Sequence, residues 1–173
     1  MHSSPMRLRR LRRKVTESNE FVEMMTTAFA LILELEFRFR ILIPHYLREH
    51  QTFYGLTHWH EDISLSFSGE KSLLRARMKL KRNEYNFVED FLPFGFWQNT
   101  VNEKNFTKIW VPFLHKAFPG INEAASMPKM KEVEQRMIAA SEFRNLVSHH
   151  NRKVLIDYEA NIENLIWLIG AMR

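Results

Sequence analysis

Apolar side chains recur every three or four residues along most of the chain, which is the spacing of one face of an α-helix. The longest such run covers residues 21–47, and its apolar positions are Phe21, Met25, Phe29, Ile32, Leu35, Phe39 and Leu42. It predicts a long first helix that kinks or ends near Pro44, because proline lacks the N–H group that a helical hydrogen bond needs. Glu34 stands four residues before Arg38, and such a pair stabilises a helix.

The same spacing returns further along the chain. Helices are expected at residues 73–102 (one or two helices), 105–117 (disturbed by Pro112), 130–149 and around residues 162–169. Residues 54–72 and 118–128 mix turn formers with aromatic side chains and are expected to be connections. Consecutive helices with short joins pack most simply against each other in alternating directions. The sequence therefore predicts an all-α fold, an antiparallel bundle of four to five helices.

The composition agrees with one helical domain. The 173 residues are 45% hydrophobic, which is enough for a core, and glycine and proline number only 5 and 6. The absence of cysteine excludes disulfides and thiolate catalysis and fits a cytoplasmic location. The uncharged segment 24–33 is about half as long as a membrane span, so we expect no membrane crossing.

Positive charge is concentrated near the N-terminus. The run consists of Arg7, Arg9, Arg10, Arg12, Arg13 and Lys14, and these six cations exceed the whole net charge of +5. Such a run binds nucleic acid or anionic lipid in some proteins, yet at a terminus it is more often a solvated or disordered tail. We therefore divide the chain into a basic N-terminal tail, residues 1–20, and a single helical domain, residues 21–173.

Basic and aromatic side chains are neighbours in the 73–102 segment. The cations are Arg75, Arg77, Lys79, Lys81 and Arg82, and the aromatic residues are Phe87, Phe91, Phe94, Phe96 and Trp97. Such a mixture can hold phosphates and stack bases, although aromatic residues at helical spacing more often form the core. We favour the core for the aromatic residues and keep Arg75, Arg77 and Lys79 as weak candidates for RNA binding.

Several common kinds of active site are not present in the sequence. The glycines are far apart, so there is no phosphate-binding loop, and no His-Glu-x-x-His motif occurs. Potential metal ligands gather only at His58, His60, Glu61 and Asp62, and this His-x-His pair lacks further ligands at a recognisable spacing. We therefore expect neither a metal nor a cofactor.

The remaining reactive side chains stand at the end of the 130–149 helix. Residues 143–152, FRNLVSHHNR, concentrate a cation, an amide and two imidazoles at Arg144, Asn145, His149 and His150. Histidine can accept and donate a proton near neutral pH, and arginine can hold a phosphate with two hydrogen bonds. On an ideal helix Arg144 and His149 are about 140° apart, whereas Asn145 and His149 share a face.

A purely structural explanation of this cluster is also open. Arg144 would then pair with an acid such as Glu34, and His149 and His150 would finish the helix by meeting its last carbonyls. This explanation requires no ligand.

The cluster also carries a resemblance to a known family. Its Arg-x-x-x-x-His pattern, from Arg144 to His149, resembles the motif of the HEPN superfamily, with the Arg-Asn start and His-His end typical of Abi-like (abortive infection) proteins. FLPFGFW at residues 91–97, followed by Trp110 and by Phe118 with Pro119, resembles the stretch that precedes the motif in that family. The first helix is also similar, so the resemblance covers most of residues 31–172.

The resemblance implies a helical bundle that forms a homodimer in which two motifs face each other. Such a dimer is a metal-independent endoribonuclease of phage defence or toxin systems, and it leaves 2′,3′-cyclic phosphate and 5′-hydroxyl ends. Arg144 would hold the scissile phosphate and His149 would transfer the proton. Asn145 would orient the imidazole, and His150 would be a second acid or would tune His149.

HEPN domains also include modules without catalysis. The alternative function is therefore a non-catalytic helical module that binds RNA or a protein partner. Arg152 and Lys153 follow the motif directly and are weak candidates for RNA contact in either case. An antitoxin or a guide RNA is a further kind of partner in such systems, and no residue specifies one.

Overall fold

The computed structural model describes residues 5–81 and 87–173, with side chains from residue 19 onward except that of Arg152, and these ranges contain helices and no β-strand. The α-helices are α1 (Pro5–Tyr54), α2 (Phe67–Leu80), α3 (Met127–Ser148) and α4 (Tyr158–Ala171). Short helical turns join them: η1 (Val88–Phe91), η2 (Phe94–Thr100), η3 (Glu103–Asn105), η4 (Phe106–Trp110), η5 (Leu114–Ala117) and η6 (Arg152–Leu155). The prediction of an all-α fold is confirmed, while Arg82 lies outside the described residues.

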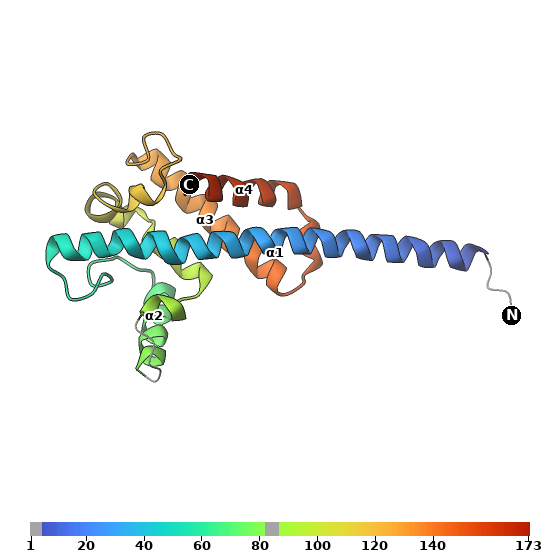
Figure 1. Ribbon diagram of the computed structural model, residues 1–173, viewed down its shortest axis with the longest axis horizontal. Helices are drawn as coiled ribbons and strands as arrows, with labels where there is room; N and C mark the ends of the chain where they lie inside the picture. The colour runs from blue at the N-terminus through green and yellow to red at the C-terminus, as the bar shows by residue number, and fades with distance from the viewer. Residues whose placement is uncertain (1–4, 82–86) are drawn as a thin grey trace.

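The first helix is longer than predicted at both ends. α1 has 50 residues, begins within the segment assigned to the basic tail, and continues through Pro44 to Tyr54. Its length is therefore about 75 Å, and Figure 1 shows its N-terminal part projecting beyond the other helices. Ile43 and Leu47 are fully buried on either side of Pro44. Their burial offsets the missing N–H bond, so the helix does not end at the proline.

α1, α3 and α4 pack together as a bundle. The Tyr158 hydroxyl donates to the Met24 carbonyl at 2.8 Å, and the Arg38 guanidinium donates to the Met172 carbonyl at 3.2 Å. Met24 precedes Arg38 along α1, and their partners Tyr158 and Met172 follow in the same order along α4. The two helices therefore run parallel. α3 runs in the opposite direction beside them, while α2 lies transverse to α1 (Figure 1).

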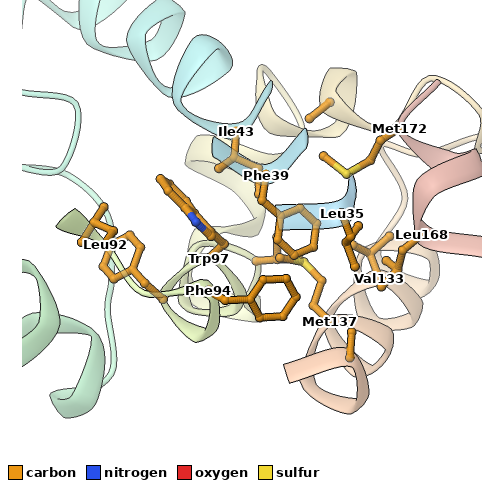
Figure 2. Close-up of a cluster of buried hydrophobic side chains, with 14 of the residues drawn as sticks. Leu35, Phe39, Ile43, Leu92, Phe94, Trp97, Val133, Met137, Leu168 and Met172 are labelled. Atoms are coloured by element: carbon orange, nitrogen blue, oxygen red, sulfur yellow. The ribbon is translucent and has the colours of Figure 1, made fainter. Parts of the chain in front are cut away.

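The core lies where α1, α3 and α4 meet the η1 and η2 turns. Figure 2 labels its central side chains, which are Leu35, Phe39 and Ile43 of α1, Leu92, Phe94 and Trp97 of the turns, Val133 and Met137 of α3, and Leu168 and Met172 near the end of α4. Phe94 stacks on Phe39 with ring centroids 5.4 Å apart. Phe94, Phe96 and Trp97 are at most 3% exposed, which confirms the prediction that these aromatic residues belong to the core. Phe87 differs, because it is 54% exposed.

Two of the expected helices are broken into short turns. Residues 105–117 form η4 and η5, which are separated around Pro112, and residues 73–102 form the end of α2 followed by η1 and η2, which Pro93 separates. A proline cannot donate the hydrogen bond that would continue the helix. The Trp110 indole N–H donates to the Ala124 carbonyl at 2.8 Å and so ties η4 to the chain just before α3.

Candidate functional site

The predicted cluster lies where α3 ends. α3 buries one face in the core, through Met130, Val133, Met137, Ala140, Phe143 and Val147. Phe143 and Val147 hold its last turns in place, at 1% and 2% exposure. Arg144 is half-buried, and Asn145, His149 and His150 are exposed. We call these four residues the motif cluster, and the buried neighbours fix it to the rest of the fold.

Backbone hydrogen bonds close the end of α3. The His150 N–H donates to the Val147 carbonyl and the Asn151 N–H to the Leu146 carbonyl, both at 3.0 Å. This pair of bonds is the Schellman arrangement, in which the residue after the C-cap His149 takes the left-handed conformation. That residue is His150, whose φ is 49°. Glycine adopts this conformation readily, whereas a residue with a Cβ atom loses about 1–2 kcal/mol there.

The structural explanation of the cluster lacks both of its expected contacts. Main-chain N–H groups, and not the imidazole rings, meet the last carbonyls of α3. Glu34 accepts a hydrogen bond from Arg38 at 2.7 Å instead of pairing with Arg144. Among the residues whose side chains are described, the motif cluster forms no side-chain hydrogen bond or ion pair. The exposed polar groups of Asn145, His149 and His150 and the half-buried guanidinium of Arg144 are therefore available to a ligand.

The cluster does not converge on one point within a single chain. His149 stands five positions after Arg144, and on an ideal helix two side chains at this spacing point about 140° apart. Asn145 and His149 are joined by the helical bond from the His149 N–H to the Asn145 carbonyl, at 3.1 Å, and leave on the same side. A phosphate held by Arg144 and a proton acceptor at His149 would thus lie in different directions in one copy.

The η6 turn between α3 and α4 packs on α3, and the start of α4 contacts α1. Val154 in η6 is fully buried, and Tyr158 bonds to the Met24 carbonyl. Burial raises the pKa of Tyr158, which therefore keeps its hydroxyl proton for that bond. Lys153 is exposed, while the side chain of Arg152 lies outside the described residues. The start of α4 thus lies beside the α1 segment around Met24.

The basic residues of α2 are separate from the motif cluster. Arg77 lines a cavity with Arg48 of α1, whereas Arg75 and Lys79 line a different depression. Arg48 lies 24 residues beyond Met24 on α1, which is about 36 Å along the helix. The candidates for RNA binding predicted from the sequence therefore form distinct groups on the molecule.

The segment with potential metal ligands is used in other ways. Asp62 pairs with Lys108, and Glu61 accepts a hydrogen bond from the Thr57 N–H at 3.0 Å. The rings of His58 and His60 stack with centroids 5.2 Å apart. Within the described residues no group of three or more His, Asp or Glu side chains is arranged to hold a metal ion.

Two charged or titratable features were missed by sequence reasoning. Glu89 is 5% exposed and pairs with Arg48, and its carbonyl accepts from Arg40 at 2.7 Å. His50 is fully buried, and burial lowers the pKa of its imidazole. Glu89 lies 41 residues from Arg48, so no local pattern could have indicated the pair.

Comparison of the chain with protein-family models, with curated proteins and with solved structures found no match. In the described part of the chain, no helix combines the length and the apolar character that crossing a membrane requires.

Proposed function

We propose that this chain is a metal-independent endoribonuclease of the HEPN type, which acts as a cytoplasmic homodimer in phage defence or in a toxin system. The observation that carries the proposal is the motif cluster itself. Its guanidinium, amide and two imidazoles gather at one helix end, and they have no side-chain partner among the described residues. Groups that hold phosphate and move protons are thus presented together to an external ligand.

The proposed reaction needs only an acid, a base and a cation. The 2′-oxygen of a ribose attacks the adjacent phosphorus while His149 takes its proton, and the 5′-oxygen leaves with a proton from an acid. That acid is His150 or the partner's His149. Arg144 stabilises the negative charge that builds on the phosphoryl oxygens. The products are a 2′,3′-cyclic phosphate and a 5′-hydroxyl.

A second copy is part of the proposal because the cluster does not converge within one chain. α1 supports self-association through an apolar stripe on its solvent side, formed by Val22, Phe29, Leu33, Phe37 and Ile41, each at least 49% exposed. Contiguous apolar surface of this kind is typical of a protein interface. The stripe begins in the part of α1 that the start of α4 contacts, at Met24. Pairing through α1 can therefore bring two motif clusters near each other.

Cleavage of labelled RNA tests the activity. His149→Ala and Arg144→Ala should each abolish cleavage, wild-type activity should survive EDTA, and end mapping should find cyclic phosphates. Arg144→Ala should also weaken RNA binding, since the guanidinium is assigned to the phosphate. His45→Ala, at an exposed position of α1 outside the motif cluster, is the control and should retain activity. Cleavage that persists in both motif variants, or that stops only with chelator, would place the chemistry elsewhere.

A non-catalytic module that binds RNA or a protein partner is the second candidate. The divergence of Arg144 and His149 within one chain favours it, because binding does not require the two groups to meet at one atom. In that case wild-type protein would bind RNA without cutting it, and Arg144→Ala would still weaken the complex.

A further inference from the structure

A cavity of about 380 Å³ opens between the C-terminal half of α1, the end of α2, the η1 turn and the 55–66 connection. Its walls come from residues far apart in sequence, including Arg48 of α1, His60 of the connection, Arg77 of α2 and Phe87 before η1. We call it the α2 pocket. None of its lining residues belongs to the motif cluster, so what it binds is a question independent of the proposed nuclease activity.

The charge of the α2 pocket is predominantly positive. Arg48, Arg77 and Lys81 line it, and the only carboxylate among its described lining residues is that of Glu89, which Arg48 already neutralises. No acid of the described residues pairs with Arg77 or Lys81. Proximity to Arg77 also contributes to the lowered pKa of His60, after the larger effect of burial. The pocket is therefore lined by two cations that no acid of the described residues neutralises, which suits a multiply charged anion.

Phe87 and two imidazoles add flat ring surface to the α2 pocket. Phe87 is 54% exposed, and the Arg48 guanidinium lies 5.2 Å from the centre of its ring. Arg48 forms an ion pair with buried Glu89. This pair fixes the guanidinium that lies beside the ring of Phe87. His58 and His60 add a stacked pair of rings whose centroids are 5.2 Å apart. Planar rings beside cations are the surfaces on which nucleobases stack next to their phosphates.

The dipole of α2 explains only part of this arrangement. Cations in the last turn of a helix are favoured by its negative end, and Arg77 and Lys79 stand there. The dipole does not account for Arg48 or for the two imidazoles, because these groups belong to other elements and converge on the same cavity.

We propose that the α2 pocket binds a nucleotide, with Arg77 and Lys81 on its phosphate and Phe87 against its base. The nucleotide is either free in solution or part of an RNA strand, and both sources share this chemistry. The proposal does not depend on Arg144 or His149, so a loss of nuclease activity would leave it unaffected.

Calorimetric titration of the full chain at low ionic strength tests the site. The probes are adenosine 5′-monophosphate, adenosine, inorganic phosphate, and a short 2′-O-methylated oligoribonucleotide that has no attacking hydroxyl. We expect the monophosphate and the oligonucleotide to bind and adenosine to bind at least about tenfold more weakly. An oligonucleotide that binds more tightly than the monophosphate identifies an RNA strand as the source, and equal affinities identify the free nucleotide.

Charge-matched variants separate the pocket from general electrostatics. The double change Arg77→Ala with Lys81→Ala should weaken binding about tenfold, whereas Lys71→Ala with Lys104→Ala, at two exposed positions outside the pocket, should weaken it no more than about twofold. Phe87→Ala should weaken binding of the monophosphate but not binding of inorganic phosphate. Phe67→Ala, at an 82% exposed position, should change the binding of neither probe. Equal losses in both double variants, adenosine binding as tightly as its monophosphate, or no binding of any probe at millimolar concentration would overturn the proposal.

Discussion

The ring of His50 is fully buried in an aromatic setting, with the rings of Tyr54 and Phe113 at centroid distances of 4.8 and 5.4 Å. Neither ring nitrogen has a hydrogen-bond partner in the described structure, although the Asp62 carboxylate lies 3.9 Å away. Burial lowers the pKa of His50 most strongly, Asp62 opposes this, and Lys108 adds to it. The folded chain therefore favours the neutral imidazole.

This burial predicts a loss of stability in acid. Below the ordinary histidine pKa of 6.5 the unfolded chain binds a proton that folded His50 resists, so the free energy of unfolding should fall as the pH drops below that value. His60, whose pKa is also lowered, should contribute to the same slope. His50→Phe should reduce the slope and stabilise the protein by about 1 kcal/mol near pH 5, as measured by urea unfolding across pH.

The control for His50 is a histidine on the surface of the same helix. His45→Phe replaces a side chain that is 61% exposed, so it should leave the pH dependence unchanged. A slope that is equally steep in His50→Phe and in wild type would show that His50 is not responsible.

At the level of elements, the end of α3 holds a conformation that its residue does not prefer. His150 is left-handed, and its conformation is required by the bonds of the His150 and Asn151 N–H groups. His150→Gly should therefore raise the free energy of unfolding by about 1 kcal/mol, because glycine takes this conformation without a Cβ clash. Urea denaturation at neutral pH measures the difference.

His149→Gly is the matched control for this prediction. His149 has φ −96°, which is an ordinary conformation, so glycine there brings no relief and adds freedom to the unfolded chain. It should be neutral or destabilising by up to about 1 kcal/mol. If both glycine variants changed stability in the same direction and by the same amount, the strain assigned to His150 would be refuted.

At the level of the whole molecule, the apolar stripe of α1 predicts the oligomeric state. The purified protein should be a dimer that buries at least about 1,000 Å² in total. Phe37 is 62% exposed on the stripe, and Phe37→Glu should shift the protein to monomer without unfolding it, because the side chain contributes little to the core. Light scattering coupled to size exclusion measures the mass, and circular dichroism measures the helix content.

Phe67→Glu provides the comparison for the stripe. Phe67 is 82% exposed at the start of α2, away from α1, so its change should leave the dimer intact. A wild-type protein that is monomeric at all concentrations would exclude the stripe as a dimer interface and would also weaken the proposed composite nuclease site.

The sequence predicted features that depend on neighbours along the chain. The apolar spacing located α3 and α4 to within a few residues, and it correctly assigned Phe94, Phe96 and Trp97 to the core. It also placed the motif cluster at a helix end, because the order of residues along a helix fixes which of them share its last turn. It left open whether the first helix kinks or ends near Pro44, and it did not predict the continuation to Tyr54, since the burial that offsets the proline comes from distant segments.

Contacts between distant residues were decided only by the tertiary structure. The parallel course of α1 and α4 follows from contacts of Tyr158 with Met24 and of Arg38 with Met172, and each of these spans 134 residues. The α2 pocket similarly joins four segments. The pairing of Glu89 with Arg48 could not be predicted from the residues around either one. Helical spacing is set by the backbone geometry of a few consecutive residues, whereas these contacts depend on how whole helices pack. For this reason the sequence alone determined the helical class and the motif cluster, and the folded chain determined which charges meet across its surface.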